Sequence, residues 1–411
     1  MDYASAIKWI YSTQLFGIKL GLDTMRRLLA ALDLPGKTQR FVHVAGTNGK
    51  GSTCAIVDSI ARAGGWRGGL YTSPHLISFC ERIRVDGATI PESEAAARLS
   101  HLRELIECWE PHPTFFEITT ALALWWFRDA EAQIVALETG LGGRLDATNA
   151  VTPVVSVITP IAFDHMQWLG NTLSKIAFEK AGVIKSSVPV VVAPQEADAM
   201  AVIRRVAGER GAPMTVIEAP WPRGPLGLAG THQRWNAALA VRALKAAGIR
   251  VTETVIERGL ATVSWPARFQ QIGTRIVIDG SHNPHGARAL AGTWREVFAS
   301  EKATIILGAV TQKNYRGIVD ALRPIAAEWI FTTVNSPRAV SARQLAATVP
   351  GARIAENCAQ ALALAGIDLS TAADPGRRGP QRVLVCGSLY LAGEALAALG
   401  NKAGLFEPSA Q

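Results

Sequence analysis

The sequence predicts an α/β protein with two domains, each built on a mainly parallel β-sheet. Short runs rich in β-branched residues alternate with longer Ala/Leu/Arg stretches of helical spacing, which is typical of parallel α/β folds. The runs are hydrophobic almost throughout, and this indicates strands that are covered by helices on both faces. The chain has 411 residues, more than one hydrophobic core usually organises, so two domains are expected.

The expected strands fall into two sets along the chain. The first set is residues 41–45, 134–138, 154–158 and 188–193. The second set is residues 276–279, 304–307, 329–334 and 382–386. Between the sets lie two stretches of helical spacing, 233–248 and 255–260, followed by Trp265-Pro-Ala-Arg268, where a proline interrupts the pattern. We therefore expect the domain boundary between residues 267 and 268.

The composition is that of an ordered protein, with 48% hydrophobic and 18% charged residues and no low-complexity tract. The N-terminal stretch lacks the basic flank and apolar run of a signal peptide, and no apolar run reaches the length of a membrane span. The five cysteines are far apart and show no Cys-x-x-Cys spacing, which argues against a disulfide framework or a zinc site. We therefore expect a cytoplasmic protein with no membrane partner.

The formal net charge of +8 comes from lysines and arginines that occur singly or in pairs among acidic residues. No basic stripe is visible in the sequence, so we expect no nucleic-acid partner. A diffuse positive field also raises the local concentration of small anionic ligands near a cleft. Small molecules are the expected partners, and a charge that serves solubility alone is the alternative.

A glycine-rich loop follows the first expected strand. It consists of Gly46, Thr47, Asn48, Gly49, Lys50, Gly51 and Ser52, and a helical stretch comes after it. Such a loop wraps backbone N–H groups around a phosphate, while the helix N-terminus and Lys50 add positive charge. The spacing departs from the Walker pattern, because Gly46 is only three residues before Gly49 and Gly51 separates Lys50 from Ser52. The loop predicts nucleotide binding, and a plain glycine-rich turn is the alternative.

The loop Gly46-Thr-Asn-Gly-Lys-Gly-Ser52 resembles the ATP loop of the Mur ligase superfamily, specifically its folylpolyglutamate synthase and dihydrofolate synthase branch. Six further motifs match that branch in its order, over nearly the full chain. They are Thr72-Ser-Pro-His-Leu76, Glu138-Thr-Gly-Leu-Gly-Gly-Arg-Leu-Asp-Ala-Thr-Asn149, Asp164-His-Met-Gln-Trp-Leu-Gly170, Glu179-Lys-Ala-Gly-Val183, Asp279-Gly-Ser-His-Asn-Pro284 and Gly387-Ser-Leu-Tyr390. The resemblance implies a P-loop-type ATP-binding domain of the Mur-ligase central type, with the folate site, over residues 1–267. A smaller Rossmann-like C-terminal ligase domain is implied over residues 268–411.

The metal and catalytic residues are implied by the same resemblance. Glu138 ends a hydrophobic run, and ligand sites in parallel sheets lie at the carboxyl ends of strands. The resemblance assigns Mg²⁺ to Ser73, Glu138 and His165, and it implies a second Mg²⁺ that Lys180 helps to hold. It also implies that Lys180 is carbamylated and so becomes an anionic oxygen ligand, which requires a partly buried amine with a lowered pKa. Lys50, Lys180 and His165 are the expected catalytic residues.

The resemblance further places ATP between the two domains, in contact with Asn236, Arg268, Asp279 and His282. Two segments depart from the pattern of the family. Its Pro-Gly-Arg is Pro266-Ala-Arg268 here, and its Asp-Lys-Asp is Gln312-Lys-Asn314. The first departure affects turn flexibility, because alanine lacks the backbone freedom of glycine. The second removes two carboxylates from a loop that orients ligands in the family.

The acceptor-binding residues come from three segments. They are Ile18, Lys19 and Leu20, the aromatic pair Phe115 and Phe116, and Leu145, Asp146 and Ala147. The aromatic pair is expected to stack on a flat ring and Asp146 to accept hydrogen bonds from the amino edge of that ring, although aromatics are as often plain core residues. Lys19 stands where some bifunctional members carry an acid, so the pterin preference is left open.

The resemblance implies an ATP-dependent ligase that adds L-glutamate to dihydropteroate, to reduced (poly)glutamyl folates or to both. The reaction passes through an acyl phosphate and releases ADP and phosphate, and we expect the enzyme to be a monomer. The alternatives are a folylpolyglutamate synthase alone, a Mur-type cell-wall amino-acid ligase and a non-catalytic P-loop nucleotide switch. About forty residues precede the phosphate loop, which is short for the extra N-terminal domain of the cell-wall ligases.

Overall fold

The structure is a computed structural model that describes residues 1–17, 21–222, 224–369, 381–400 and 407. The chain divides into two compact units. Unit 1 comprises Met1–His75, Phe79–Gly227 and Arg234–Val263. Unit 2 comprises Leu76–Ser78, Leu228–Gln233 and Ser264–Gln411. Each unit is described separately below.

Unit 1 contains, within the described residues, an eight-stranded sheet in the order β4-β3-β2-β5-β1-β6-β7-β8. Its strands are β1 (Arg40–Ala45), β2 (Gly68–Tyr71), β3 (Ile83–Val85), β4 (Ala88–Thr89), β5 (Ile134–Glu138), β6 (Val155–Ile158), β7 (Val190–Val192) and β8 (Met214–Val216). The six strands from β2 to β8 in this order are parallel, whereas β3 and β4 pair antiparallel at one edge. The carboxyl ends of β1, β5 and β6 therefore lie side by side.

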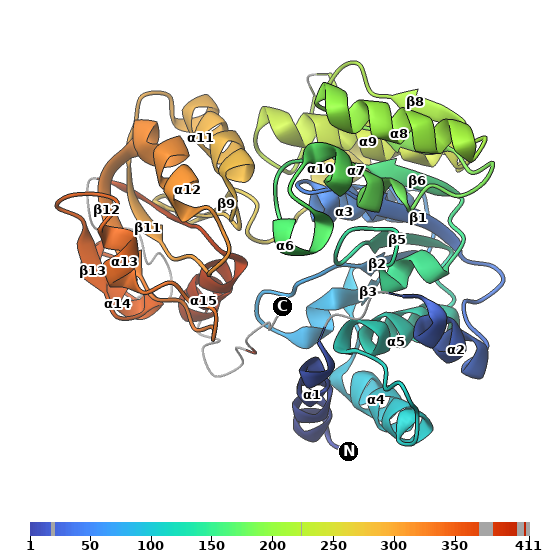
Figure 1. Ribbon diagram of the computed structural model, residues 1–411. Coiled ribbons are helices and arrows are strands. Elements are labelled where there is room, and N and C mark those ends of the chain that lie inside the picture. Colours follow the sequence, from blue (N-terminus) through green and yellow to red (C-terminus); the bar gives the residue numbers. More distant parts are fainter. Residues whose placement is uncertain (18–20, 223, 370–380, 401–406, 408–411) are drawn as a thin grey trace. The chain divides into compact units, whose positions relative to one another are not determined.

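Helices flank both sheets in Figure 1. Those of the first part of the chain are α1 (Tyr3–Ser12), α2 (Asp23–Ala31), α3 (Lys50–Ala63), α4 (Glu92–Ile106), α5 (Phe115–Asp129), α6 (Met166–Leu169), α7 (Leu173–Ala181), α8 (Ala197–Glu209), α9 (Thr231–Ala246) and α10 (Glu253–Thr262), with the 3-10 turns η1 (Thr13–Phe16), η2 (Phe79–Arg82) and η3 (Ala147–Ala150). Among the described residues, no helix combines the length and the apolar character that crossing a membrane requires.

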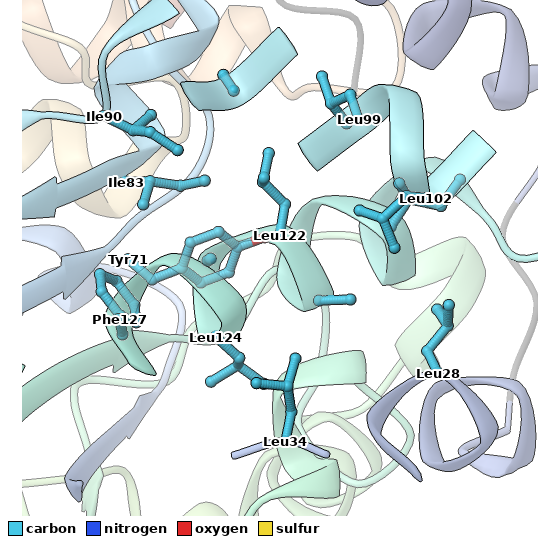
Figure 2. Close-up of a cluster of buried hydrophobic side chains, with 14 of the residues drawn as sticks. Leu28, Leu34, Tyr71, Ile83, Ile90, Leu99, Leu102, Leu122, Leu124 and Phe127 are labelled. Carbon is cyan, nitrogen blue, oxygen red and sulfur yellow. The ribbon is translucent and has the colours of Figure 1, made fainter. Parts of the chain in front are cut away.

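The largest hydrophobic core of unit 1 packs α1, α2, α4 and α5 against the sheet. Figure 2 shows side chains of this core, among them Tyr71 of β2, Leu99 of α4 and Leu122 of α5. α5 begins at a capping box in which Thr114 accepts from the N–H of Glu117 while the Glu117 carboxylate accepts from the N–H of Thr114. Burial of each large side chain contributes about 1.5–3 kcal/mol. The helices of this core cover the face of the sheet that lies opposite to α3.

Unit 2 contains, in the part of the chain that the structure describes, a six-stranded sheet in the order β13-β12-β11-β14-β10-β9. Its elements are β9 (Gln270–Ile272), β10 (Ile276–Ile278), α11 (Pro284–Phe298), β11 (Ala303–Leu307), α12 (Tyr315–Leu322), η4 (Arg323–Ile325), β12 (Ala326–Thr332), α13 (Ala342–Ala346), β13 (Arg353–Ala355), α14 (Cys358–Leu364), β14 (Arg382–Cys386) and α15 (Leu389–Leu399). Alternate strand residues enter two different cores, one with α11–α13 and one with α14 and α15.

The α/β class with two mainly parallel sheets, expected from the sequence, is confirmed. The strands expected at 134–138 and 382–386 have the observed bounds. The strand expected at 329–334 instead runs from Ala326 to Thr332, and the one expected at 188–193 is reduced to Val190–Val192. The end of a strand depends on the neighbouring strand. A residue that has no partner there is not part of the sheet, even if its β-propensity is high.

Candidate functional site

The phosphate loop connects β1 to α3, and its glycines are required by close approach to other segments. Gly46 has a φ of +149°, and a Cβ there would lie 1.9 Å from Thr159 Oγ1. Gly49 has a φ of +90°, and a Cβ there would lie 2.6 Å from Asn236 Oδ1 on α9. Any side chain at either position would force the loop away from β6 or α9. The predicted nucleotide residue Asn236 therefore lies directly against the phosphate loop.

The first turn of α3 offers backbone N–H groups to a ligand. The first four N–H groups of a helix have no acceptor inside it, and in α3 these belong to residues 49–52. Within the described residues no side chain caps this helix at Gly49. The N–H groups of Thr47 and Asn48, in contrast, donate to the carbonyl oxygen of Pro160 at 3.0 and 3.3 Å. A phosphate would therefore be held by the first turn of α3, where the helix dipole also favours an anion.

Lys50 and two predicted metal ligands meet at the carboxyl ends of β1 and β5. Lys50 Nζ lies 3.9 Å from Glu138 Oε1, and it donates to the carbonyl oxygen of Thr47 at 3.4 Å. Glu138 is 5% exposed, and its Oε2 accepts from the backbone N–H of Ser73 at 3.1 Å. β1 and β5 are adjacent and parallel, and this is why their ends bring a cation and a carboxylate together beside the phosphate loop.

The residues around Glu138 fit a divalent cation with oxygen ligands. Ser52 Oγ, in the first turn of α3, is buried and has no hydrogen-bond partner among the described residues. The described ranges contain no cluster of three or more His, Cys, Asp and Glu side chains suited to a metal. Mg²⁺ binds through one or two carboxylates together with hydroxyls, substrate phosphates and water, so it does not need such a cluster. A buried carboxylate at the end of β5 and a hydroxyl without a partner in the first turn of α3 are oxygen donors of the kind that Mg²⁺ prefers.

Lys180 lies near the C-terminal end of α7 and is buried, with 5% of its surface exposed. Its Nζ donates to the carbonyl oxygen of Gly46 at 2.7 Å. The resemblance implies a partly buried amine, and Lys180 is buried, with its Nζ against the first glycine of the phosphate loop. Sequence alone gives no sign of this burial, because a lysine in a short amphipathic helix is usually exposed.

His165 occupies the N-cap of α6, in the loop that follows β6. Its backbone is left-handed, with a φ of 50°, and its side chain is 46% exposed. The Asp164 carboxylate accepts from the backbone N–H of His165 at 2.9 Å, and His165 Nε2 lies 3.9 Å from Asp164 Oδ1. The structure therefore places His165 on a loop at the same edge of the sheet as Glu138, oriented in part by Asp164.

In unit 2, Asp279 follows β10 and organises the turn that carries the other predicted nucleotide residues. Its two carboxylate oxygens accept from the N–H groups of Phe269 and Ser281, each at 2.9 Å. Arg268 donates to the carbonyl oxygen of Ala267 at 2.9 Å, and His282 Nδ1 lies 2.9 Å from the carbonyl oxygen of Gly280. Asp279, Arg268 and His282 are thus brought onto adjoining turns at one end of the second sheet.

Both departures from the family pattern have a structural account. Ala267 has a φ of +54°, which lies in the left-handed region where glycine is relaxed and alanine is strained. Asn314 is the N-cap of α12, and its Oδ1 accepts from the N–H of Gly317 at 2.9 Å. Asparagine caps helices about as well as aspartate, so Asn314 keeps the capping contact while the negative charge is lost.

The predicted acceptor residues Ile18, Lys19 and Leu20 lie outside the described residues. Phe115 is a core residue, 7% exposed and stacked on Tyr11 with ring centroids 5.6 Å apart. Phe116 is half-buried and tilted against Tyr71 at 6.0 Å. A Cβ on Gly140 would lie 2.5 Å from Phe116 Cζ, so the loop after β5 packs closely on that ring. Phe116 is therefore the better placed of the two phenylalanines to contact a ligand.

Asp146 is buried and surrounded by donors, between the half-buried Leu145 and the buried Ala147. Burial raises the pKa of Asp146 above its usual value, while hydrogen bonds from Thr148, Leu141 and Gly140 act in the opposite direction. These bonds fix the turn after β5. Direct contact between Asp146 and a ring amino group stays a prediction, next to this observed role in holding the turn.

Sequence reasoning missed two buried polar residues of this region, His43 and Thr148. His43 Nε2 lies 2.8 Å from Thr148 Oγ1, and both residues are fully buried. The available signal was a histidine inside the hydrophobic run 41–45, where a polar side chain must find a partner.

Two family models match the chain. The Mur ligase middle domain matches residues 44–217, and the Mur ligase glutamate ligase domain matches residues 267–389. The dihydrofolate synthase/folylpolyglutamate synthase of Bacillus subtilis is 37% identical over 377 residues, which are 84% of this chain and 88% of the relative.

Two solved structures extend the comparison. Escherichia coli FolC in complex with DHPP and ADP superposes with a TM-score of 0.87 at 32% identity, over 98% of each chain. The bifunctional folylpolyglutamate synthase/dihydrofolate synthase of Yersinia pestis, complexed with AMPPNP and a Mn ion, gives a TM-score of 0.84 at 32% identity, over 97% of this chain and 98% of that one. The chain belongs to the dihydrofolate synthase/folylpolyglutamate synthase family of ATP-dependent ligases, within the Mur ligase superfamily.

Proposed function

We propose that this protein couples ATP hydrolysis to the addition of L-glutamate to dihydropteroate and to reduced (poly)glutamyl folates. The observation that carries the proposal is the meeting of Lys50, Ser73 and Glu138 beside the uncapped first turn of α3. The relatives bound to ADP and DHPP, and to AMPPNP and Mn, support the same substrates and a divalent metal for this chain.

The first step joins two anions. An oxygen of the acceptor carboxylate attacks the γ-phosphorus of ATP, the bond to the β–γ bridging oxygen breaks, and ADP leaves. The N–H groups of residues 49–52 and the ammonium of Lys50 stabilise the negative charge that develops on the phosphoryl group. Preorganised donors of this kind need no rearrangement during the reaction, because Gly46 and Gly49 already hold the loop against β6 and α9.

Mg²⁺, when bound, supplies Lewis-acid stabilisation of the phosphates, and Ser52, Ser73, Glu138 and His165 would hold it. Lys180 is proposed to carry a carbamate. A carbamylated lysine keeps one N–H, so the contact from Nζ to the carbonyl oxygen of Gly46 is compatible with the modification. Two Mg²⁺ ions are proposed, as the resemblance implies.

The second step forms the amide. The amine of L-glutamate attacks the carbonyl carbon of the acyl phosphate, inorganic phosphate leaves, and the amine loses a proton. The turn after β5, held by Asp146 and packed on Phe116, is the proposed acceptor side of unit 1 together with Leu145 and Ala147. Ile18, Lys19, Leu20 and Phe115 complete the proposed acceptor set.

We also propose that Asn236, Arg268, Asp279 and His282 contact ATP. The close approach of Asn236 to Gly49 supports this for Asn236. A domain division at 267/268 is proposed in addition, and it is supported by the start of the C-terminal family match at residue 267. A monomeric state and a cytoplasmic location, the latter supported by five free cysteines, complete the proposal.

The decisive experiment is phosphate release from purified protein with ATP, Mg²⁺, L-glutamate and one acceptor at a time. Dihydropteroate and a reduced monoglutamyl folate should each support release, and mass spectrometry should find the acceptor heavier by one glutamyl residue per turn. Release that needs no amine would indicate a nucleotide switch instead. Release with a UDP-muramoyl acceptor only would indicate a cell-wall ligase.

Activity with folates but not with dihydropteroate would narrow the function to a folylpolyglutamate synthase. If neither pterin acceptor supports glutamate-dependent phosphate release, the folate assignment is wrong, even if the ligase chemistry is correct. D-glutamate in place of L-glutamate is the matched control, because it has the same composition and charge and differs only in the configuration at Cα.

A further inference from the structure

A hydrogen-bonded chain joins the middle of β1 to the turn after β5. His43 Nε2 lies 2.8 Å from Thr148 Oγ1, which in turn donates to Asp146 Oδ1. Asp146 Oδ2 accepts from the backbone N–H groups of Gly140 and Leu141 at 3.0 and 2.8 Å. The strand that leads into the phosphate loop is thus tied, through the side chains of His43, Thr148 and Asp146, to the conformation of a turn about one hundred residues later.

The direction of each hydrogen bond follows from the donors around Asp146. Backbone N–H groups donate to both of its oxygens, and the hydroxyl of Thr148 donates to Oδ1, so both carboxylate oxygens act as acceptors. The single hydroxyl hydrogen of Thr148 is therefore used in the hydrogen bond to Asp146. Its oxygen then accepts from His43, which must carry its proton on Nε2.

His43 remains neutral in this environment. Burial lowers the pKa of His43 to about 3, and the nearby charge of Lys185 acts in the same direction. With the proton on Nε2, Nδ1 is left as an acceptor, and it has no hydrogen-bond partner among the described residues. A buried nitrogen without a hydrogen bond destabilises the folded protein, and an apolar residue at this strand position would not have one. The hydrogen bond from His43 to Thr148 is the contact that offsets this destabilisation.

The turn that this chain holds is packed against an aromatic ring. A Cβ on Gly140 would lie 2.5 Å from Phe116 Cζ, so there is no space between the turn and the ring. A shift of the N–H groups of Gly140 and Leu141 would therefore displace Phe116 or open a gap beside it. The shape of this surface depends on Asp146, and the orientation of Asp146 depends on Thr148 and His43.

We propose that His43 is a positioning residue for the acceptor: through Thr148 it orients Asp146 and holds residues 139–146 in the conformation that receives the flat ring of the acceptor. The proposal rests on the function proposed above, which places the acceptor against this turn. His43 itself is fully buried and acts only through its neighbours. Its removal should change acceptor binding without changing ATP binding.

The test compares three variants at this position. His43→Leu removes the donor and keeps an apolar side chain of similar size, and His43→Asn keeps an amide that is too short to reach Thr148. Both should raise the KM for the acceptor by about tenfold or more, the usual effect of losing a hydrogen bond in a charged network. His43→Gln places an amide nitrogen near the Nε2 position and should restore most of the acceptor affinity. The KM for ATP should stay within about twofold in all three.

Two measurements separate positioning from general destabilisation. Ile203→Ala is the control, because Ile203 is a fully buried residue of α8 in another core of unit 1. Hydrogen exchange followed by mass spectrometry should show faster exchange at residues 139–146 in His43→Leu and His43→Asn, but not in His43→Gln or Ile203→Ala. The proposal would be overturned if exchange at residues 139–146 were unchanged in His43→Leu and His43→Asn. It would also be overturned if the KM values for ATP and for the acceptor rose in parallel.

The exchange experiment needs no substrate, so it is independent of the proposed function. If the wild-type protein used no pterin acceptor at all, that result would refute the proposed function. Faster exchange at residues 139–146 would then still support the contact from His43 to the turn, and unchanged exchange would refute it.

Discussion

The ammonium of Lys180 donates a 2.7 Å hydrogen bond to the carbonyl oxygen of Gly46, which joins α7 to the first glycine of the phosphate loop. Lys180→Ala should lower kcat by about 100-fold or more, because a buried donor beside the loop and a proposed anionic ligand are lost together. A small carboxylate such as acetate should restore part of the activity. Phosphate release with and without acetate measures both effects.

Lys175→Ala is the matched control for this experiment, since Lys175 lies on α7 and is exposed. It should leave kcat unchanged. Removal of bicarbonate should lower the activity of the wild-type protein and not that of Lys180→Ala. Full wild-type activity in bicarbonate-free buffer would exclude the proposed carbamate.

Lys50 begins α3 with its Nζ 3.9 Å from the Glu138 carboxylate. Lys50→Ala should reduce phosphate release by more than about 100-fold, because the cation that stabilises the transferred phosphoryl group is removed. Circular dichroism and the melting curve should remain close to those of the wild-type protein. The exposed Lys8→Ala is the control, and near-normal turnover in folded Lys50→Ala would contradict the assignment.

Glu138 and His165 are the proposed metal ligands with titratable side chains. Glu138→Gln keeps the size of the side chain and removes its charge, so the Mg²⁺ concentration needed for half-maximal activity should rise at least about tenfold. His165→Ala should show a smaller rise, because His165 is 46% exposed and more easily replaced by water. Identical Mg²⁺ titrations for the wild-type protein and both variants would show that neither residue binds the metal.

The buried His43 should make stability depend on pH in a defined direction. Its pKa is about 3 in the folded protein and near 6.5 when unfolded, so below pH 6.5 the unfolded chain takes up a proton that the folded chain does not. Stability from this group is therefore lost as the pH falls, by about 1.4 kcal/mol per pH unit within that window. His43→Gln has no such group, and its melting temperature should fall less between pH 6.5 and pH 4.5 than that of the wild-type protein.

Gly280 lies where a Cβ would approach Arg268 Nη1 to 2.6 Å and Leu389 Cδ2 to 2.4 Å. Gly280→Ala should displace Arg268 and raise the KM for ATP by about threefold or more, with little effect on the KM for the acceptor. Gly292→Ala on α11, where nothing lies within 4 Å of the added Cβ, is the control and should be active. Equal KM values for ATP in the two variants would argue against a nucleotide contact by Arg268.

The strands and the phosphate loop were predictable because their signals are local. β5 and β14 are short hydrophobic runs with a clear end, and the pattern alone gives their bounds. β2 was not predicted, since Gly68-Gly-Leu-Tyr71 has poor strand propensity. It forms because β5 and β3 offer hydrogen-bonding partners on both sides. The glycines are needed there: a Cβ on Gly68 would lie 2.4 Å from Asp58 Oδ1.

The candidate site was predictable only in part. Glu138 was predictable from its place at a strand end and Lys50 from the glycine loop, but the contact between Lys180 and Gly46 joins residues far apart in sequence. The role of Asp146 in holding the turn after β5 also depends on donors that the turn itself supplies once folded. Such contacts arise from packing, which no single segment encodes.

The close approach of Asn236 to Gly49 can form only after much of the chain has been synthesised. The phosphate loop is among the first segments to leave the ribosome, yet the side chain that lies against it emerges nearly two hundred residues later. A nascent chain that ends at residue 217, where the middle-domain match ends, would carry the loop without α9 and α10. At about 5–20 residues per second, the stretch from Gly49 to Asn236 takes about 10–40 seconds to synthesise. The phosphate loop therefore gains its contact with α9 only after residue 236 has left the exit tunnel, and any earlier folding of the loop proceeds without that side chain.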